Sequence, residues 1–496
     1  MRDWRGLLPD DVGPLRDHQE QAFKRARLVA ARDTDEKITV LQATPGAGKS
    51  MAAVLFANVL IRAGFVDRVV VVVPRDSLRE QMCEAFAEAA ERGLTLKVAA
   101  AASEVSSKVI FGNAGYVTTY QAVAQRAGAR HLKAVENCRV LLILDEIHHL
   151  VDEEGRGWVP GVKALVEHAT HVLAMSGNLG RDDEKPIPFI PYGDDKSPIK
   201  HIVYSRRTAL DEHAIIPLNV VLQDGDTEYF HKGREHEVTL STASAKEERG
   251  AINTALSLDE YRDRLLTTGL ASWLDYRDSH YRSQLIVVCD KQRDARNVAH
   301  RIREGHPTFD VALAISDEGA DGQRMLKRFR KRQADVLVTC MMAYEGLDAP
   351  FATHMIYLSN KRSIPWLEQA TARVTRFNRV CGLPWEKQAA AVFAPGDQSM
   401  RAFVAQLDRE QDDAFREHAK REAPGGVPRR GDFCPISAEA TTVVAGGDGV
   451  GVPSAEVQEQ VAKLKAEIPT LQHVPFADLV KLANRVHGRH LDPAAE

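Results

Sequence analysis

A short segment of small residues, Ala43-Thr-Pro-Gly-Ala-Gly-Lys-Ser50, constrains the fold of this chain more than any other part of its sequence. Before it lies an apolar run at residues 38–42 with the pattern of a buried strand, and after it an apolar run at 51–61 long enough for a helix. A strand, a small-residue loop and a helix in this order are typical of phosphate-binding loops, because backbone N–H groups converge there on phosphate oxygens. The segment therefore predicts an α/β fold that binds a nucleoside triphosphate.

Individual residues of this loop have distinct expected roles. Thr44, Gly46 and Gly48 are expected to line the phosphates of ATP. Lys49 would reach the β- and γ-phosphates as a point charge, and the Ser50 hydroxyl would ligate Mg²⁺. The sequence thus predicts ATP and Mg²⁺ as ligands, although an alanine replaces the first glycine that is usual in such loops.

Length, charge and cysteine usage limit the class of protein. At 496 residues the chain is too long for one hydrophobic core, so we expect two or three domains. A net charge of −4 argues against a globally basic nucleic-acid coat, so any nucleic acid would be held in a local groove. The longest apolar run, residues 69–73, is far shorter than a membrane span, and the first residues lack an apolar signal core. The six cysteines contain no Cys-x-x-Cys pair, which favours a reduced cytoplasmic protein without membrane association.

Strand-like and helix-like segments alternate in two blocks. The first block contains candidate strands at 38–42, 69–73, 96–100, 116–119, 140–144 and 171–175. The second contains candidate strands at 284–289, 311–315, 336–339, 353–358 and 389–393. Such alternation predicts parallel sheets covered by helices on both faces, and hence two tandem α/β lobes.

Breaks in this alternation predict the domain boundaries. An N-terminal lobe would span 1–210, and a connector with its own helices and a short strand at 215–222 would span 211–282. The C-terminal lobe would span 283–422. A flexible linker rich in glycine and proline at 423–453 would lead to a small helical tail at 454–496.

Two adjacent carboxylates end one of the apolar strands. The run at 141–144 leads directly into Asp145, Glu146 and, two residues on, His148. Ligands bind at this carboxyl end of the strands in open α/β sheets. Asp145 would hold Mg²⁺, while Glu146 would orient and deprotonate an attacking water.

Taken together, these motifs resemble the superfamily-2 helicases and translocases of the DExH type, over about residues 14 to 400. The resemblance implies two RecA-like lobes that hydrolyse ATP between them and bind nucleic acid across both. Gln19 lies in a segment similar to the family's adenine-reading motif, and His148 would couple the nucleotide site to motifs III and VI. Four positions in segments similar to motifs Ia and Ib would contact the nucleic-acid backbone: Arg75, Ser77, Thr118 and Thr119.

Further positions follow from the same resemblance. Asn178 departs from the threonine that is usual in motif III, which puts in question how hydrolysis is coupled to movement. In a segment similar to motif V, Thr339 would touch nucleic acid, while Gly346 and Asp348 would face the nucleotide.

The segment at 369–376 resembles motif VI and supplies Gln369, Arg373 and Arg376. The two arginines lie three positions apart, so on a helix they would share one face. Such arginine fingers neutralise charge in the transition state and can be worth roughly 10³–10⁵ in rate.

Details of the sequence favour DNA over RNA as the nucleic acid. Residues 181–198 and 204–217 resemble the stretch after motif III in restriction-enzyme helicase subunits and phage DNA-remodelling helicases. No nuclease constellation is visible in the tail, so a role in phage defence or DNA processing would require a partner protein such as a nuclease. The C-terminal tail could dock such a partner, or it could simply pack back on the second lobe. Two alternatives stay open: an RNA helicase, since these motifs contact a backbone common to both polymers, and a nucleotide-driven switch or scaffold that unwinds nothing.

Overall fold

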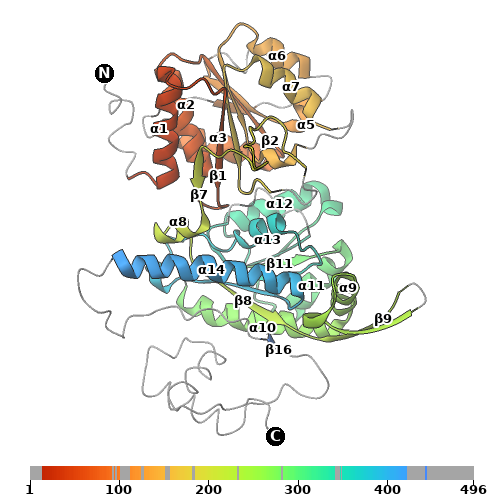
Figure 1. Cartoon of the computed structure of the whole chain (residues 1–496). Coiled ribbons are helices and arrows are strands. Elements are labelled where there is room, and N and C mark those ends of the chain that lie inside the picture. Colours follow the sequence, from red (N-terminus) through yellow and green to blue (C-terminus); the bar gives the residue numbers. More distant parts are fainter. Residues whose placement is uncertain are drawn as a thin grey trace. The chain divides into compact units, whose positions relative to one another are not determined.

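The structure, a computed structural model, describes residues 14–91, 94, 98–100, 112–124, 128–150, 157–180, 185–231, 234–280, 283–340, 347, 349–421 and 442–443. Its contacts divide the chain into two compact units (Figure 1). The first unit holds the described residues as far as Ile215, together with Leu347 and Ser363–Ala372. The second unit holds the other described residues. One segment from late in the sequence is thus part of the first unit.

The first unit is built on a parallel sheet with the strand order β3-β4-β2-β5-β6-β1-β7. Its strands are β1 (Ile38–Ala43), β2 (Arg68–Val73), β3 (Val98–Ala100), β4 (Gly115–Thr119), β5 (Val140–Leu144), β6 (His171–Ser176) and β7 (Ile202–Tyr204). Every residue of β5 and β6 is buried, as expected for strands covered on both faces. The sheet therefore brings the carboxyl ends of β1, β5 and β6 to neighbouring positions along one edge.

The first unit also contains helices. They are α1 (Asp17–Ala31), α2 (Lys49–Arg62), α3 (Asp76–Glu91), α5 (Tyr120–Ala124), α6 (Gly128–Val135), α7 (Val159–His168), α8 (Arg206–Asp211) and α13 (Ile364–Thr371), with a 3₁₀ turn, η3, at Ile147–His149. The helix after the phosphate loop, α2, is buried at every position from Ala52 to Leu60. Its apolar sequence reflects this burial, since a helix that is apolar all round belongs in a core.

The second unit is built on another parallel sheet, with the strand order β12-β13-β11-β14-β15-β8-β16. Its strands are β8 (Leu218–Gln223), β11 (Gln284–Cys289), β12 (Val311–Ala314), β13 (Val336–Thr339), β14 (Ala352–Leu358), β15 (Ala390–Pro395) and β16 (Thr442–Val443). Its helices are α9 (Glu248–Ser257), α10 (Asp259–Ser279), α11 (Gln292–Gly305), α12 (Gly319–Arg330) and α14 (Gln398–Arg421), with 3₁₀ turns η4 (Leu240–Thr242), η5 (Ser316–Glu318) and η7 (Trp385–Lys387).

An antiparallel hairpin in the second unit was not predicted from the sequence. It consists of β9 (Asp226–His231) and β10 (Arg234–Thr239). The ring of Tyr229 stacks on His236 at 5.0 Å, and its hydroxyl donates to the main-chain oxygen of Glu247 at 3.1 Å. Much of the hairpin is charged and exposed, so it lacks the apolar alternation that identifies a strand from sequence.

The predicted fold class is confirmed: two parallel α/β sheets form two RecA-like lobes, and helices α9 and α10 lie in the predicted connector. The predicted short strand before them is β8, which pairs in parallel with β15 and so belongs to the second sheet. The predicted helical tail at 454–496 lies outside the described residues. Within the described part of the chain, every helix is too short or too polar to cross a membrane.

Packing between α10 and the second sheet depends on one glycine. A Cβ atom at Gly269 would lie 2.5 Å from the side chain of Ile356 on β14 and 3.4 Å from that of Phe393 on β15. We therefore predict that Gly269→Ala destabilises the second unit by about 1–3 kcal/mol, the usual cost of overpacking. The midpoint of urea unfolding measures this loss. Gly305→Ala is the control, because a Cβ there meets no atom within 4 Å; equal midpoints for the two variants would contradict the prediction.

Candidate nucleotide-binding site

The loop between β1 and α2 adopts the conformation that the sequence predicts for a phosphate-binding loop. Gly46 has a φ of 83° and Gly48 a φ of 93°, in the left-handed region where glycine carries no steric cost. The N–H of Ala47 donates to the oxygen of Thr44 at 3.2 Å, which closes the turn. The N–H of Thr44 itself donates to the oxygen of Tyr204 on β7 at 2.9 Å. The loop is therefore fixed to the neighbouring strand at its start and enters α2 at Lys49.

Side chains from the start of α1 lie against this loop. Nη1 of Arg16 donates to the main-chain oxygen of Ala47 at 2.5 Å, and its own N–H donates to Oε1 of Gln19 at 3.1 Å. A Cβ at Gly48 would lie 3.5 Å from Nε2 of Gln19. The predicted adenine-reading residue thus lies beside the phosphate loop.

His18 is a neighbour of the loop that sequence analysis did not single out. Its Nε2 lies 3.5 Å from the oxygen of Gly48, and its ring packs on Tyr204 at 4.2 Å. Burial lowers the pKa of His18 to about 4, so the imidazole is neutral at physiological pH. The only sequence signal for Arg16 and His18 is their place beside Gln19.

The carboxylate pair at the end of β5 is connected directly to the loop. Nζ of Lys49 forms an ion pair with Oε1 of Glu146, and both side chains are close to nine-tenths buried. The other oxygen of Glu146 accepts from the N–H of Gly177 at 3.1 Å. Glu146 has a φ of 47°, a conformation that is rare for residues other than glycine and that occurs most often at functional sites. The backbone is thus strained at the residue predicted to activate water.

Opposite electrostatic effects act on these two carboxylates. Burial and the neighbouring charge of Glu146 raise the pKa of Asp145. Burial acts in the same direction on Glu146, but Lys49 and then His148 more than offset it, and the pKa of Glu146 is lowered. Glu146 is therefore ionised at neutral pH.

His148 connects this carboxylate to the end of β6 and to α13. Its Nδ1 lies 2.8 Å from Oγ of Ser176 and 3.4 Å from Oε2 of Glu146. Its Nε2 lies 3.5 Å from Nε2 of Gln369, which is buried on α13. The structure thus brings Lys49, Glu146, His148 and Gln369 together within the first unit.

A second contact to α13 comes from the unusual residue of motif III. Nδ2 of Asn178 donates to Oε2 of Glu368 at 2.9 Å. Its orientation is set on the other side, where Oδ1 of Asn178 accepts from the N–H of Gly180 at 2.7 Å. Glu368 was not predicted as a site residue, because nothing in the sequence links it to Asn178.

Arg373 and Arg376 do not share a helix face, and that expectation is wrong. Helix α13 ends at Thr371, so both arginines follow it in a turn and an extended stretch of the second unit. The main-chain oxygen of Thr375 accepts from the N–H of Ile216 at 2.8 Å, which holds this stretch away from helical geometry. β-Branched residues next to Arg376 favour the extended form as well.

Among the positions predicted to contact nucleic acid, Arg75 is exposed at the end of β2, while Thr118 is fully buried in β4. Thr119 is partly buried, and its Oγ1 accepts from the N–H of Ala122 at 3.2 Å, at the start of α5. Of these three side chains, Arg75 is therefore the most accessible. The side chain of Ser77 is outside the described part of the structure.

The motif V positions are also partly outside the described residues. Thr339 is fully buried and donates through Oγ1 to the oxygen of Ala314 at 2.7 Å, so its hydroxyl is engaged within the sheet. Gly346 and Asp348 lie outside the described residues.

Asp145, one of the two residues predicted to hold Mg²⁺, has a fixed main chain. Tyr120 donates its hydroxyl to the main-chain oxygen of Asp145 at 2.9 Å, and the N–H of Asp145 donates to Val72 at 2.9 Å, which fixes this residue at the end of β5. No group of three or more His, Cys, Asp or Glu side chains in the described ranges could hold a metal by itself. Mg²⁺ commonly binds through one or two protein oxygens plus substrate phosphates, a role suited to Asp145 and Ser50.

A phosphate loop joined to a strand-end carboxylate pair, with a second RecA-like lobe in the same chain, defines the class of helicase-type nucleotide-driven enzymes. Comparison with known families agrees. Residues 13–179 match the model for "Type III restriction enzyme, res subunit", and residues 266–378 match the model for "Helicase conserved C-terminal domain". These matches identify the chain as a member of the superfamily-2 helicases.

Relatives and solved structures extend this comparison. An uncharacterized protein of Mycobacterium leprae is 27% identical over 81% of this chain, which spans 65% of the length of that relative. The type ISP restriction-modification enzyme LlaBIII bound to DNA matches with a TM-score of 0.52 and 13% identity, over 94% of this chain and 33% of its own. Mss116p bound to single-stranded RNA and AMP-PNP matches with a TM-score of 0.52 and 11% identity, over 99% of this chain and 91% of its own. At these identities the two structures show the fold alone.

The hydrogen bond from Asn178 to Glu368 can be tested by substitution. Asn178→Asp replaces the amide donor by a carboxylate that faces another carboxylate, so α13 should be held less firmly. We expect ATP turnover to fall severalfold, with Glu368→Gln restoring it in the Asn178→Asp background, because the amide donor then lies on the other partner. Steady-state kcat for the single and double variants measures this. Equal kcat for Asn178→Asp and the unmodified chain would contradict the prediction.

Proposed function

We propose that this chain is a DNA translocase or helicase that uses ATP hydrolysis to move along or remodel DNA. One observation carries the proposal: the buried ion pair between Lys49 of the phosphate loop and Glu146 at the end of β5. It brings a phosphate-binding cation and a general base to one point, as hydrolysis of a terminal phosphate requires.

In the proposed mechanism, Lys49 exchanges Glu146 for the phosphate oxygens of ATP. Glu146 then orients a water molecule, with Gly177 N–H and His148 keeping the carboxylate in place. Mg²⁺, held by Ser50 and Asp145, would neutralise charge on the phosphates. Gln19 would read the adenine, since it lies beside the loop that binds the phosphates.

Other predicted residues complete the proposal. Arg373 and Arg376 would stabilise the developing charge on the γ-phosphate, and Gly346 and Asp348 would face the nucleotide. The backbone of the nucleic acid would be held by the residues at motifs Ia, Ib and V, of which Arg75 is the exposed member described here. Because such contacts are mainly to phosphates, binding would weaken steeply with salt.

DNA is the proposed polymer because residues 13–179 match a restriction-enzyme model, and because LlaBIII, a structural neighbour, is bound to DNA. The neighbour Mss116p is bound to RNA, which keeps the RNA helicase as the alternative. The lobe, connector, linker and tail boundaries stay predictions, as do a cytoplasmic location and a partner nuclease that docks on the tail.

A nucleotide-driven switch that unwinds nothing is the second candidate. The contact of Asn178 with Glu368 favours it, because motif III here carries a residue other than the usual threonine and has its own partner. A strand-separation assay set beside the ATPase rate distinguishes a switch from a helicase.

We expect Lys49→Ala to abolish ATP turnover by removing the phosphate-binding charge. Glu146→Gln should abolish turnover as well while leaving ATP binding intact, since the amide keeps the shape but cannot act as a base. Turnover and binding of a fluorescent ATP analogue measure the two effects. Retained hydrolysis in both variants would reject these assignments.

Arg376→Ala should leave ATP binding nearly unchanged and reduce kcat by about 10³-fold, the range typical of an arginine finger. The measurement is kcat and KM for ATP in the presence of DNA. Lys331→Ala, at an exposed residue after α12, is the matched control for loss of a positive charge. An unchanged kcat in Arg376→Ala would show that this residue is not a finger.

The polymer is tested by the ATPase rate without nucleic acid and with single-stranded DNA, duplex DNA, forked DNA or RNA, using Lys49→Ala as the blank. We expect stimulation by DNA over RNA. Stimulation by RNA alone would reassign the chain to the RNA helicases, and a rate indifferent to every polymer would favour the switch.

A further inference from the structure

A short stretch of chain links β14 to the helix that carries Gln369. Arg362 is the last residue of the second unit before the segment Ser363–Ala372, which belongs to the first unit. Ser363 directly precedes α13, and Arg373 returns the chain to the second unit. Whatever fixes Arg362 therefore fixes the point at which α13, the helix that leads into motif VI, begins.

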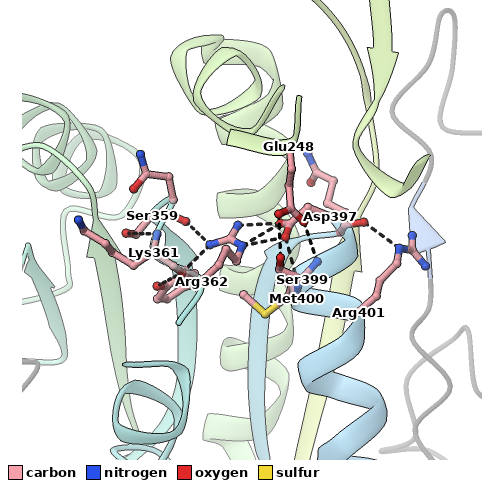
Figure 2. Close-up of polar contacts among 12 residues, drawn as sticks. Glu248, Ser359, Lys361, Arg362, Asp397, Ser399, Met400 and Arg401 are labelled. Carbon is pink, nitrogen blue, oxygen red and sulfur yellow. Dashed lines mark hydrogen bonds and ion pairs between the residues drawn. The ribbon is translucent and has the colours of Figure 1, made fainter. Parts of the chain in front are cut away.

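Arg362 forms a buried ion pair with Asp397, which lies between β15 and α14 (Figure 2). Its Nε donates to both carboxylate oxygens, at 2.9 and 3.0 Å, and Nη2 donates to Oδ2 at 2.8 Å. Nη1 donates to the main-chain oxygens of Ser359 at 2.7 Å and Lys361 at 2.9 Å. The Arg362 side chain is 10% exposed and that of Asp397 0%. One guanidinium thus holds the exit from β14 against the start of α14.

Asp397 is itself firmly held. Its Oδ1 accepts from the N–H of Met400 at 3.1 Å, which caps the first turn of α14. The same turn is tied to α9, because the N–H and the hydroxyl of Ser399 each donate to the carboxylate of Glu248 at 2.7 Å (Figure 2). Asp397 cannot shift without breaking these contacts, so it provides a rigid reference for Arg362.

Stability alone does not account for a buried ion pair at this place. Burial acts to lower the pKa of Arg362, but the interaction with Asp397 more than offsets it and raises the pKa, so the guanidinium is charged. Removing two charges from water is costly, and an uncharged pair of similar volume often gives equal or greater stability. What a guanidinium adds is direction, because its planar fork fixes both distance and angle to the carboxylate.

The stretch of chain that follows α13 is also anchored in the second unit. Nε2 of Gln388 donates to the oxygen of Asn378 at 2.8 Å, and its Oε1 accepts from the N–H of Asn378 at 3.1 Å; both side chains are buried. Three residues before Asn378, the main-chain oxygen of Thr375 accepts a hydrogen bond from the N–H of Ile216. The predicted finger Arg376 lies between these two fixed points.

We propose that Arg362 and Asp397 are positioning residues for ATP hydrolysis, which fix the start of α13 so that Gln369 and the two arginines after α13 take up their working positions. The inference rests on the proposed function. It assigns the pair no contact with ATP; the pair acts through the segment that follows it.

The test removes the ion pair while keeping the cap on α14. In Arg362→Met combined with Asp397→Asn, no charge is left unpaired and the amide oxygen still accepts from Met400. We expect a melting temperature within about 4 °C of the unmodified chain. We expect KM for ATP to stay within about twofold, and kcat to fall about tenfold or more, because small misplacements of catalytic groups have large effects on rate.

A matched control comes from another ion pair of the same unit. Nη2 of Arg277 on α10 lies 2.6 Å from Oδ1 of Asp335, which directly precedes β13, at the amino end of that strand. Arg277→Met with Asp335→Asn should leave kcat unchanged. An unchanged kcat in the folded Arg362 and Asp397 double variant, or an equal fall in the control, would overturn the proposal.

Hydrogen–deuterium exchange gives a readout that does not depend on activity. Peptides covering residues 363–378 should exchange faster in the double variant and not in the control. If the double variant does not fold, Arg362→Lys replaces it, since lysine keeps the charge but lacks the fork; unchanged exchange and kcat in that variant would overturn the proposal. Absence of ATP hydrolysis by the unmodified chain would reject the proposed function, whereas the exchange experiment separately accepts or rejects the anchoring role.

Discussion

The buried ion pair between Lys49 and Glu146 is the interaction on which the candidate site depends. It joins the phosphate loop after β1 to the carboxylates after β5, two strands that β6 separates in the sheet. Glu146 needs this partner, because a carboxylate buried to this extent without compensation would be strongly disfavoured. Its left-handed backbone conformation and its bond to Gly177 N–H then set the direction in which it can act.

The same site extends beyond the phosphate loop through polar contacts rather than through apolar packing. His148 reaches Ser176 on one side and Gln369 on the other, and Asn178 reaches Glu368. Hydrogen bonds have defined directions, so a change at Glu146 can alter the geometry at α13. Apolar contacts would transmit such a change less specifically, because they depend little on orientation. The buried ion pair of Arg362 with Asp397 in the second unit is directional in the same way, and it lies just before the segment that contains α13.

Sequence patterns predicted the fold well because the constraints involved are local. The strands β11 and β13 lie where their Val- and Ile-rich runs predicted, since a strand covered on both faces must be apolar throughout. The hairpin of β9 and β10 was missed for the converse reason: its exposed, charged residues carry no such pattern. The end of α13 was also missed, because the three-residue spacing of Arg373 and Arg376 fits a helix, whereas the hydrogen bond from Ile216 to Thr375, which holds the stretch after the helix, joins residues distant in sequence.

By itself, the sequence determined two tandem α/β lobes, and it predicted a nucleoside-triphosphate site on the first of them. The phosphate loop and the strand-end carboxylates allow few other folds, since each depends on residues adjacent in the chain. Only the tertiary structure decided which partners these residues have, including Gly177 for Glu146, Glu368 for Asn178 and Asp397 for Arg362. Such pairings join residues distant in sequence, and their geometry is fixed by sheet order and burial, which no local pattern encodes.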